Sequence, residues 1–200
     1  KAFDQLPAKL RENWLWIPLP DPPPRCIGLD RMIEKDLPDD AWHTESETRR
    51  LLAQMSPSNA FKLEQSTVLA QAKRSPVYGC GYRRTRNEHG KKVQRFEVRF
   101  DGLAGCLRTP GGGSSRQFVL SVEPDRLRTR LLAAREAARL MGIPDSYILP
   151  VRYNEAYHLC GDGVVVDAVK WLSSTVLEPM IQNKRETHGT NKRHTLSAIT

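Results

Sequence analysis

The chain lacks several features that would each define a class of protein. No apolar run approaches the roughly 18 residues that a membrane-spanning helix needs, and no signal peptide opens the sequence. Cys26, Cys80, Cys106 and Cys160 include no C-x-x-C pair, and the five histidines show no metal spacing with them. A zinc site is therefore not expected, and reduced thiols in the cytoplasm are the default. The first residue is Lys1 rather than Met, so residue 1 need not be the natural start.

Positive charge is abundant and concentrated in one block. The chain has 200 residues, the length of one domain or of a sizeable piece of a larger protein, and 39% hydrophobic residues, enough for a core. Residues 1–72 carry 9 basic and 11 acidic side chains, residues 73–139 carry 16 and 6, and residues 140–200 carry 6 and 6. The middle block therefore carries a net charge of +10, which exceeds the +8 of the whole chain because the first block carries −2. An arginine-rich block favours a nucleic-acid partner over a mere solubility surface.

The first third predicts a connector and two helices. Residues 1–25 are rich in tryptophan and proline and favour an extended connector. Thr44-Glu45-Ser46-Glu47 is a capping box before a helix through Met55. Ser56-Pro57 ends that helix and starts another, which we expect to reach about Gln71.

The basic block predicts a β-hairpin. Tyr82–Arg86 and Val93–Phe100 flank a turn sequence at residues 87–90, and in the second arm Phe96, Val98 and Phe100 alternate with charged residues. This pattern is typical of half-buried strands with a charged outer face. A glycine loop at residues 111–115 and a strand at Phe118–Val122 follow.

Two more helices are expected towards the C-terminus. The first is Leu131–Met141, closed by Gly142 and Pro144. The second is Val164–Leu177, ended by Pro179; it is apolar on nearly every side, so we expect it to be buried. Residues 181–200 are polar and favour a loose tail.

Three blocks, in order, resemble the C-terminal part of DNA cytosine-5 methyltransferases. Gly102–Gly113, GLAGCLRTPGGG, is similar to the late target-recognition region with its glycine loop. Arg135–Tyr147, REAARLMGIPDSY, resembles the ninth conserved motif of the family, and Asn154–Val164, NEAYHLCGDGV, the tenth. The resemblance covers about 70 residues, and the ninth-motif block is its most specific part.

The resemblance implies both a function and a missing half. Such enzymes flip a cytosine out of duplex DNA, attack it with a cysteine in a Pro-Cys context, and take a methyl group from S-adenosylmethionine. None of the four cysteines follows a proline, and the glycine-rich cofactor loop is absent as well. We therefore expect this chain alone to be inactive. Its expected partners are double-stranded DNA and a catalytic half or large subunit, in a bacterial, nucleoid-associated setting.

The expected fold is α+β. A small β-rich target-recognition domain with a basic hairpin is flanked by helices, and the last helix packs on an α/β Rossmann-like domain outside this chain. The expected parts are residues 1–60, connector and helices; 61–149, the recognition domain; 150–180, the tenth-motif segment; and 181–200, the tail. A fragment of a longer enzyme is favoured over the small subunit of a split one.

The candidate site residues form three groups. Predicted DNA contacts on the hairpin are Arg83, Arg84, Arg86, Arg95 and Arg99. Predicted contacts around the glycine loop, where backbone can approach a base edge or phosphate, are Arg108, Gly111, Gly112, Gly113, Ser114, Ser115 and Arg116. Residues predicted to border the cofactor are Asp162, Gly163 and Val164, where the family usually carries Asn-x-Val.

Each of these three groups also has a non-functional explanation. The arginines could form a solvated face, the glycine loop could be a simple turn, and Asp162 could be an ordinary residue near a helix N-terminus. Arg135, Glu136 and Arg139 are assigned a structural role. Ala133 stands where the family commonly has Ser or Thr, so we hypothesise that Ala133→Thr stabilises the fold by roughly 1 kcal/mol. A non-catalytic DNA-binding regulator is the alternative function, and a basic RNA-binding protein is the third.

Overall fold

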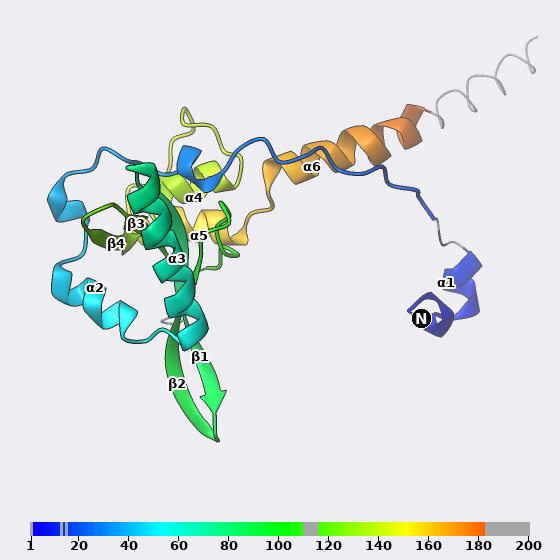
Figure 1. Ribbon diagram of the computed structural model, residues 1–200. Coiled ribbons are helices and arrows are strands. Elements are labelled where there is room, and N and C mark those ends of the chain that lie inside the picture. The colour runs from blue at the N-terminus through cyan, green and yellow to red at the C-terminus, as the bar shows by residue number, and fades with distance from the viewer. Residues whose placement is uncertain (1, 13, 15, 110–115, 183–200) are drawn as a thin grey trace, which may run out of the picture. The chain divides into compact units, whose positions relative to one another are not determined.

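The structure is a computed structural model that describes residues 2–12, 14, 16–109 and 116–182 (Figure 1). Among these residues, no helix is long and apolar enough to cross a membrane. The chain divides into two compact units, Arg25–Val166 on the one hand and Lys1–Pro24 with Asp167–Thr200 on the other. The four-part division of the chain expected from the sequence stays a prediction.

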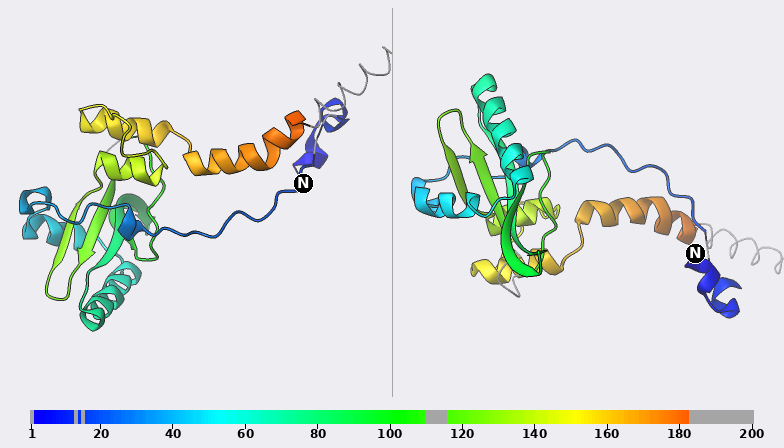
Figure 2. Two further views of the ribbon diagram at one scale, coloured as in Figure 1. Left: turned by 90° about the horizontal axis from the view of Figure 1, so that it is seen from above. Right: turned by 60° about the horizontal axis from the view of Figure 1, so that its bottom comes forward.

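The unit Arg25–Val166 is built on one antiparallel sheet with the strand order β2-β1-β3-β4. The strands are β1 (Val77–Glu88), β2 (Lys91–Arg99), β3 (Gln117–Val122) and β4 (Leu127–Leu131). The predicted hairpin is confirmed, and its turn residues His89 and Gly90 both have positive φ, at 50° and 78°. Its arms are longer than predicted and project beyond the rest of the unit in Figure 1, while the left view of Figure 2 shows the sheet from above.

Helices cover both faces of this sheet, which makes the unit α+β. They are η2 (Leu29–Arg31), η3 (Asp39–Ala41), α2 (Glu45–Leu52), α3 (Pro57–Lys73), α4 (Ala134–Leu140) and α5 (Tyr153–Asp162). The capping box of α2 is confirmed: Thr44 Oγ1 accepts from Glu47 N at 3.2 Å, and Thr44 N donates to Glu47 Oε2 at 2.8 Å. The helix expected over Leu131–Met141 begins only at Ala134, because Leu127–Leu131 form β4.

One face of the sheet packs against α2 and α3. Phe96 and Val98 of β2 join Phe118, Leu120 and Leu51 in a buried cluster, as the alternation in β2 predicts. The rings of Phe96 and Phe118 meet edge to face at 5.4 Å. By strand register, a side chain at Gly81 would point to the same sheet face as these two rings. A Cβ there would lie 2.5 Å from the Phe96 ring, so glycine leaves room for it.

The corner between α2 and α3 closes the outer edge of the sheet. β2 is an edge strand, so its outward N–H groups need partners other than a neighbouring strand. Phe96 N donates to Gln54 O at 3.0 Å, and Val98 N donates to Asn59 Oδ1 at 3.0 Å. Asn59 is buried, so this side chain takes the place of a fifth strand at that position.

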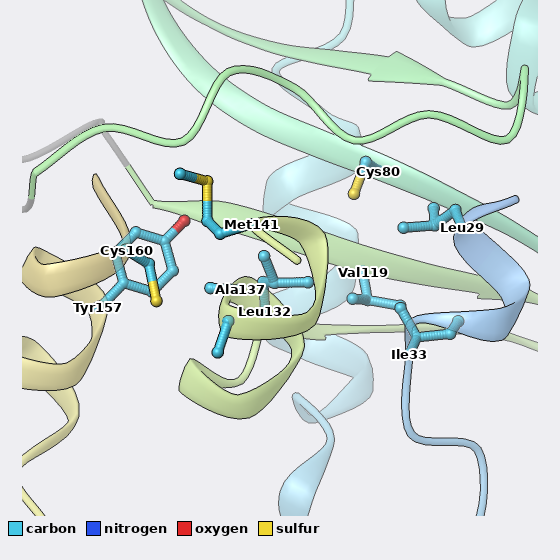
Figure 3. Close-up of a cluster of buried hydrophobic side chains, with 10 residues drawn as sticks. Leu29, Ile33, Cys80, Val119, Leu132, Ala137, Met141, Tyr157 and Cys160 are labelled. Carbon is cyan, nitrogen blue, oxygen red and sulfur yellow. The ribbon is translucent and has the colours of Figure 1, made fainter. Parts of the chain in front are cut away.

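The second face is covered by η2, α4 and α5. Figure 3 shows its cluster, in which Leu29 and Ile33 meet side chains from β1, β3, α4 and α5. Tyr157 of α5 is fully buried there, and its hydroxyl accepts from Gln117 N at 3.1 Å. The helix α5 is therefore an integral part of the core.

Further helical elements lie near the two ends of the chain. η1 (Phe3–Gln5) and α1 (Ala8–Glu12) lie at the N-terminus, where the rings of Phe3, Trp14 and Trp16 lie 5.4–5.7 Å from one another. At the other end α6 (Val166–Leu172) continues as the π-helical turn η4 (Ser173–Leu177).

The burial expected for the last helix does not occur within this chain, since Val169 is 49% exposed and Leu177 54%. Apolar periodicity identifies a face that can be buried but not the surface that covers it. The expected packing on a domain outside this chain stays a prediction. The expectation that Pro179 ends the helix is wrong, since residues 178–182 are helical. The π-helical turn ends at Leu177, two residues before Pro179, and changes the backbone pairing where the proline supplies no N–H.

Candidate nucleic-acid interface

A groove of about 1150 Å³ runs along the hairpin. Its lining comes from β1 and β2, from the start of α3, from the segment between β2 and β3, and from the end of α5. Six of the predicted DNA-contacting residues line it together: Arg83, Arg84, Arg86, Arg95, Arg99 and Arg108. The fold therefore gathers arginines that are spread over 26 positions of the sequence.

Strand register divides the hairpin arginines between two faces. Arg84 pairs with Arg95, Tyr82 with Glu97, and Arg99 with Cys80, so these side chains share one face. Arg83 pairs with Phe96 and belongs to the other face, where its guanidinium lies 5.9 Å from the Phe118 ring centre.

Arg83 shares a cavity with Arg116, the first described residue after the glycine loop. Both border a second, smaller cavity of about 180 Å³ that His43, Glu47 and Arg50 line as well. Arg116 therefore lies outside the larger groove and shares a cavity with Arg83 alone among the predicted DNA contacts that the structure describes. Gly111, Gly112, Gly113, Ser114 and Ser115 lie outside the described residues.

Carboxylates hold three of the groove arginines in fixed orientations. Arg86 Nε lies 2.5 Å from Glu97 Oε1, and Arg99 makes a two-pronged pair with Asp101 at 2.8 and 2.6 Å. Arg95 makes a similar two-pronged pair with Glu88, with Nε at 2.7 Å from Oε1.

These pairs keep the carboxylates ionised. Partial burial would raise the pKa of Glu97, but hydrogen bonds from Arg86 and Tyr82 outweigh it, and its pKa lies below the ordinary value. The hydrogen bonds from Arg95 and Arg99 likewise lower the pKa of Glu88 and of Asp101. At neutral pH three of the six groove arginines, Arg86, Arg95 and Arg99, are therefore paired with ionised carboxylates.

Arg84 and Arg108 are placed differently from the three arginines that carboxylates hold. Arg84 stacks over the Tyr82 ring with its guanidinium carbon 5.7 Å from the ring centre, and Arg108 is exposed. The sequence did not point to Glu97 or Tyr82, whose hydroxyl donates to Glu97 Oε2 at 2.8 Å. Both could have been found from the alternation, because they fall on the same strand face as Arg84 and Arg95.

The segment between β2 and the glycine loop is tied to the sheet. Arg99 Nη1 donates to Ala104 O at 3.2 Å, and Gln117 Nε2 donates to Cys106 O at 3.3 Å. Gly105 packs so closely on Gln117 that a Cβ would lie 2.5 Å from its Oε1. These contacts fix the backbone that leads to Arg108.

Of the three predicted cofactor residues, Asp162 lies at the end of the same groove and Gly163 and Val164 follow it in the chain. Asp162 is the last residue of α5 and lines the groove, with its carboxylate 2.9 Å from His158 Nδ1. Gly163 and the exposed Val164 connect α5 to α6, and Val166 N donates to Met141 O at 2.9 Å. Asp162 therefore ends one helix rather than starting another, so the expected array of free N–H groups does not lie at this residue.

The buried thiols are unsuited to nucleophilic attack. Burial raises the pKa of Cys80 to about 12 and also raises that of Cys160. Only the thiolate attacks, so both residues act as core side chains. In the parts of the chain that the structure describes, no group of three His, Cys, Asp or Glu could hold a metal ion.

Comparison with known proteins assigns the chain to a family. The family model for C-5 cytosine-specific DNA methylase matches residues 29–178. The chain belongs to the C-5 cytosine-specific DNA methylase family. This confirms the resemblance carried by the ninth-motif and tenth-motif blocks, both of which fall inside the match.

Two curated members of the family are similar to parts of the chain. Type II methyltransferase M.HpaII of Haemophilus parainfluenzae is 29% identical over 133 residues, which cover 58% of this chain and 37% of that protein. Type II methyltransferase M1.ScrFI of Lactococcus lactis subsp. cremoris is 33% identical over 64 residues, or 32% of this chain and 16% of that protein. The chain thus spans well under half the length of either methyltransferase, and no solved structure matches it.

Proposed function

We propose that this chain provides target recognition in a DNA cytosine-5 methyltransferase and contributes one wall of its S-adenosylmethionine pocket. The observation that carries the proposal is the groove, which joins six arginines to Asp162 at the end of α5. A groove of this composition can hold the phosphates and base edges of duplex DNA next to the place where a cofactor would bind.

The proposed division of work follows from the residues present. Arg84 and Arg108 offer guanidinium groups to phosphate or to guanine, while Arg86, Arg95 and Arg99 present theirs at angles that the carboxylates set. Asp162, Gly163 and Val164 would border the cofactor; their exposed position fits one wall of a pocket that other parts of the enzyme complete. S-adenosylmethionine supplies the methyl group when bound. The nucleophilic cysteine belongs to the catalytic half.

Binding to duplex DNA is the first test. Fluorescence anisotropy with a short labelled duplex, repeated over a range of salt concentrations, gives the affinity and its salt slope. Arg84→Ala and Arg108→Ala should each weaken binding and lower the salt slope by about one. Arg126→Ala is the matched control, because it removes the same charge from the exposed turn between β3 and β4, outside the groove. Equal losses in all three variants would contradict a specific groove.

Methyl transfer separates this function from the alternatives. Labelled S-adenosylmethionine and duplex DNA are incubated with the chain alone, and then with the chain and the catalytic half of a C-5 cytosine methyltransferase. We expect no transfer by the chain alone and a gain on mixing. Transfer by the chain alone would overturn the proposal, and DNA binding without any gain would favour the regulatory module. Preference for RNA over duplex DNA would favour the third alternative.

A further inference from the structure

The helix α5 contacts the chain on both sides of the glycine loop. On the side that follows the loop, Asn154 Oδ1 accepts from Arg116 Nη2 at 2.6 Å, and the Tyr157 hydroxyl accepts from Gln117 N at 3.1 Å. On the side that precedes it, Gly161 packs against the backbone of Arg108 and Thr109. One helix thus holds the entry and the exit of this loop.

The spacing of the three residues explains how one helix reaches both sides. Asn154, Tyr157 and Gly161 stand at positions i, i+3 and i+7, which lie along one face of an α-helix. Asn154 is near the first turn and Gly161 near the last, so the contacts span the helix. The buried Tyr157 between them anchors this face in the core.

Gly161 allows an approach that no other residue permits. A Cβ at this position would lie 2.5 Å from Thr109 N and 2.6 Å from the Arg108 carbonyl carbon. Both are backbone atoms, which cannot swing away as the end of a side chain can. Any larger residue would therefore move Arg108 and Thr109 away from α5.

Arg116 is oriented by a neutral partner rather than by a carboxylate. Its guanidinium donates to the Asn154 amide and lies 5.6 Å from the centre of the Tyr153 ring. The arginines Arg86, Arg95 and Arg99 instead have their charge compensated by carboxylates. An amide and an aromatic ring fix the direction of the guanidinium and leave its full positive charge available to a phosphate.

We propose that Asn154, Tyr157 and Gly161 are positioning residues for DNA binding, which hold Arg116 and Arg108 in place on the two sides of the glycine loop. This inference rests on the proposed function, because it assumes that both arginines contact DNA. Holding the arginines before DNA arrives removes part of the entropy cost of ordering them on binding. The tenth-motif helix then serves the DNA site as well as bordering the cofactor with its last residue, Asp162.

The test is a double-mutant cycle between Asn154 and Arg116 in DNA binding. Asn154→Ala should keep the fold, because Asn154 is exposed near the start of α5 and Ala favours helix. We expect it to weaken binding of the labelled duplex by about threefold to tenfold, the effect of one charge-assisted hydrogen bond. Asn154→Ala should cause little further loss once Arg116→Ala is present, because its effect acts through that side chain.

Leu159→Ala is the matched control on α5. Leu159 is uncharged, partly exposed, and takes no part in the contacts to the loop, so its truncation should leave DNA affinity unchanged. Gly161→Ala tests the other side of the loop and should weaken binding by a similar factor, with no further loss in an Arg108→Ala background. Thermal melting of each variant shows that the fold is retained.

The outcomes separate the two proposals. If Arg116→Ala weakens binding but Asn154→Ala does not, or if the two losses are additive, the positioning role is wrong while the proposed function stands. The positioning role is also wrong, and the proposed function stands, if Arg84→Ala weakens DNA binding but Arg116→Ala leaves it unchanged. If the unchanged chain fails to bind duplex DNA, the proposed function fails and the positioning role with it.

Discussion

Arg130 of β4 and Glu136 of α4 form a two-pronged ion pair that is closed off from solvent. Arg130 Nη1 lies 2.7 Å from Glu136 Oε2, and Nη2 lies 2.5 Å from Oε1. The two side chains are only 3% and 0% exposed. Each carboxylate oxygen also accepts from a backbone N–H, from Ala133 at 2.7 Å and from Glu34 at 2.6 Å. The pair thus joins the sheet, α4 and the segment after η2, which supports the structural role expected for Glu136.

Replacing Glu136 should strongly destabilise the fold. Glu136→Gln leaves the buried Arg130 charge uncompensated, and breaking a buried pair in this way costs about 3–5 kcal/mol. Urea denaturation followed by circular dichroism measures the free energy of unfolding. Glu155→Gln is the control, because Glu155 pairs with Arg152 on the surface and its loss should cost well under about 1 kcal/mol. Similar values for the two variants would show that the buried pair has no special weight.

The start of α4 offers a stabilising substitution. Glu136 already accepts from the backbone N–H of Ala133, but Ala133 has no side-chain oxygen to accept from the Glu136 N–H in return. In α2 the equivalent Thr44 completes the box. Ala133→Thr should therefore raise the free energy of unfolding by about 1 kcal/mol. Ala133→Val has the same shape without the hydroxyl and should bring no gain; an equal gain in both would rule out capping as the cause.

The elements that the sequence predicts well are those with strong local signals. The capping box of α2, the proline at the start of α3 and the alternation in β2 each act within a few residues, and all three elements are present. The helix α5 and the strand β4 were missed. In β4, Thr129 and Arg130 are buried because partners in other elements satisfy them: Thr48 and His43, more than 80 positions away, for the hydroxyl, and Glu136 of α4 for the guanidinium. No local pattern reveals such partners.

In the candidate site, too, the sequence reveals local features but not contacts between distant residues. The arginines were identifiable because a run of one charge on a predicted hairpin is a local feature. Their pairing was not, because Glu97 and Glu88 are orientated towards Arg86 and Arg95 by the strand register across the turn. The positioning role proposed for α5 rests on contacts between residues 38 and 40 positions apart, which only the fold brings together.

Stability should fall at mildly acidic pH because of His43. Its ring nitrogen Nδ1 lies 3.0 Å from Thr129 Oγ1. Burial lowers the pKa of His43 below the ordinary value of 6.5, and Arg50 adds to this effect while Glu47 opposes it. As pH falls through about 6.5, the unfolded chain therefore takes up a proton that the folded chain resists, and the free energy of unfolding decreases. Below the folded pKa the loss levels off.

His43→Gln should flatten this dependence between neutral and mildly acidic pH, as measured by urea denaturation at a series of pH values. His89→Asn is the control: His89 is exposed in the hairpin turn with φ of 50°, a conformation that Asn tolerates. It should keep the profile of the unchanged chain. A profile that His43→Gln leaves as steep as before would place the titrating group elsewhere.

Glu97 should set the strength of non-specific DNA binding. It lies on the groove wall, accepts from Tyr82 and Arg86, and is ionised at neutral pH because its pKa is lowered. Glu97→Gln keeps an acceptor for Tyr82 but removes the negative charge and frees Arg86 for a phosphate. We expect duplex affinity to rise by roughly threefold to tenfold at low salt and the salt slope to steepen by up to about one.

Glu155→Gln is the control, because it removes a carboxylate that does not line the groove, and it should change neither the affinity nor the salt slope. If affinity were unchanged by Glu97→Gln at every salt concentration, the Arg86–Glu97 pair would lie outside the DNA-binding surface.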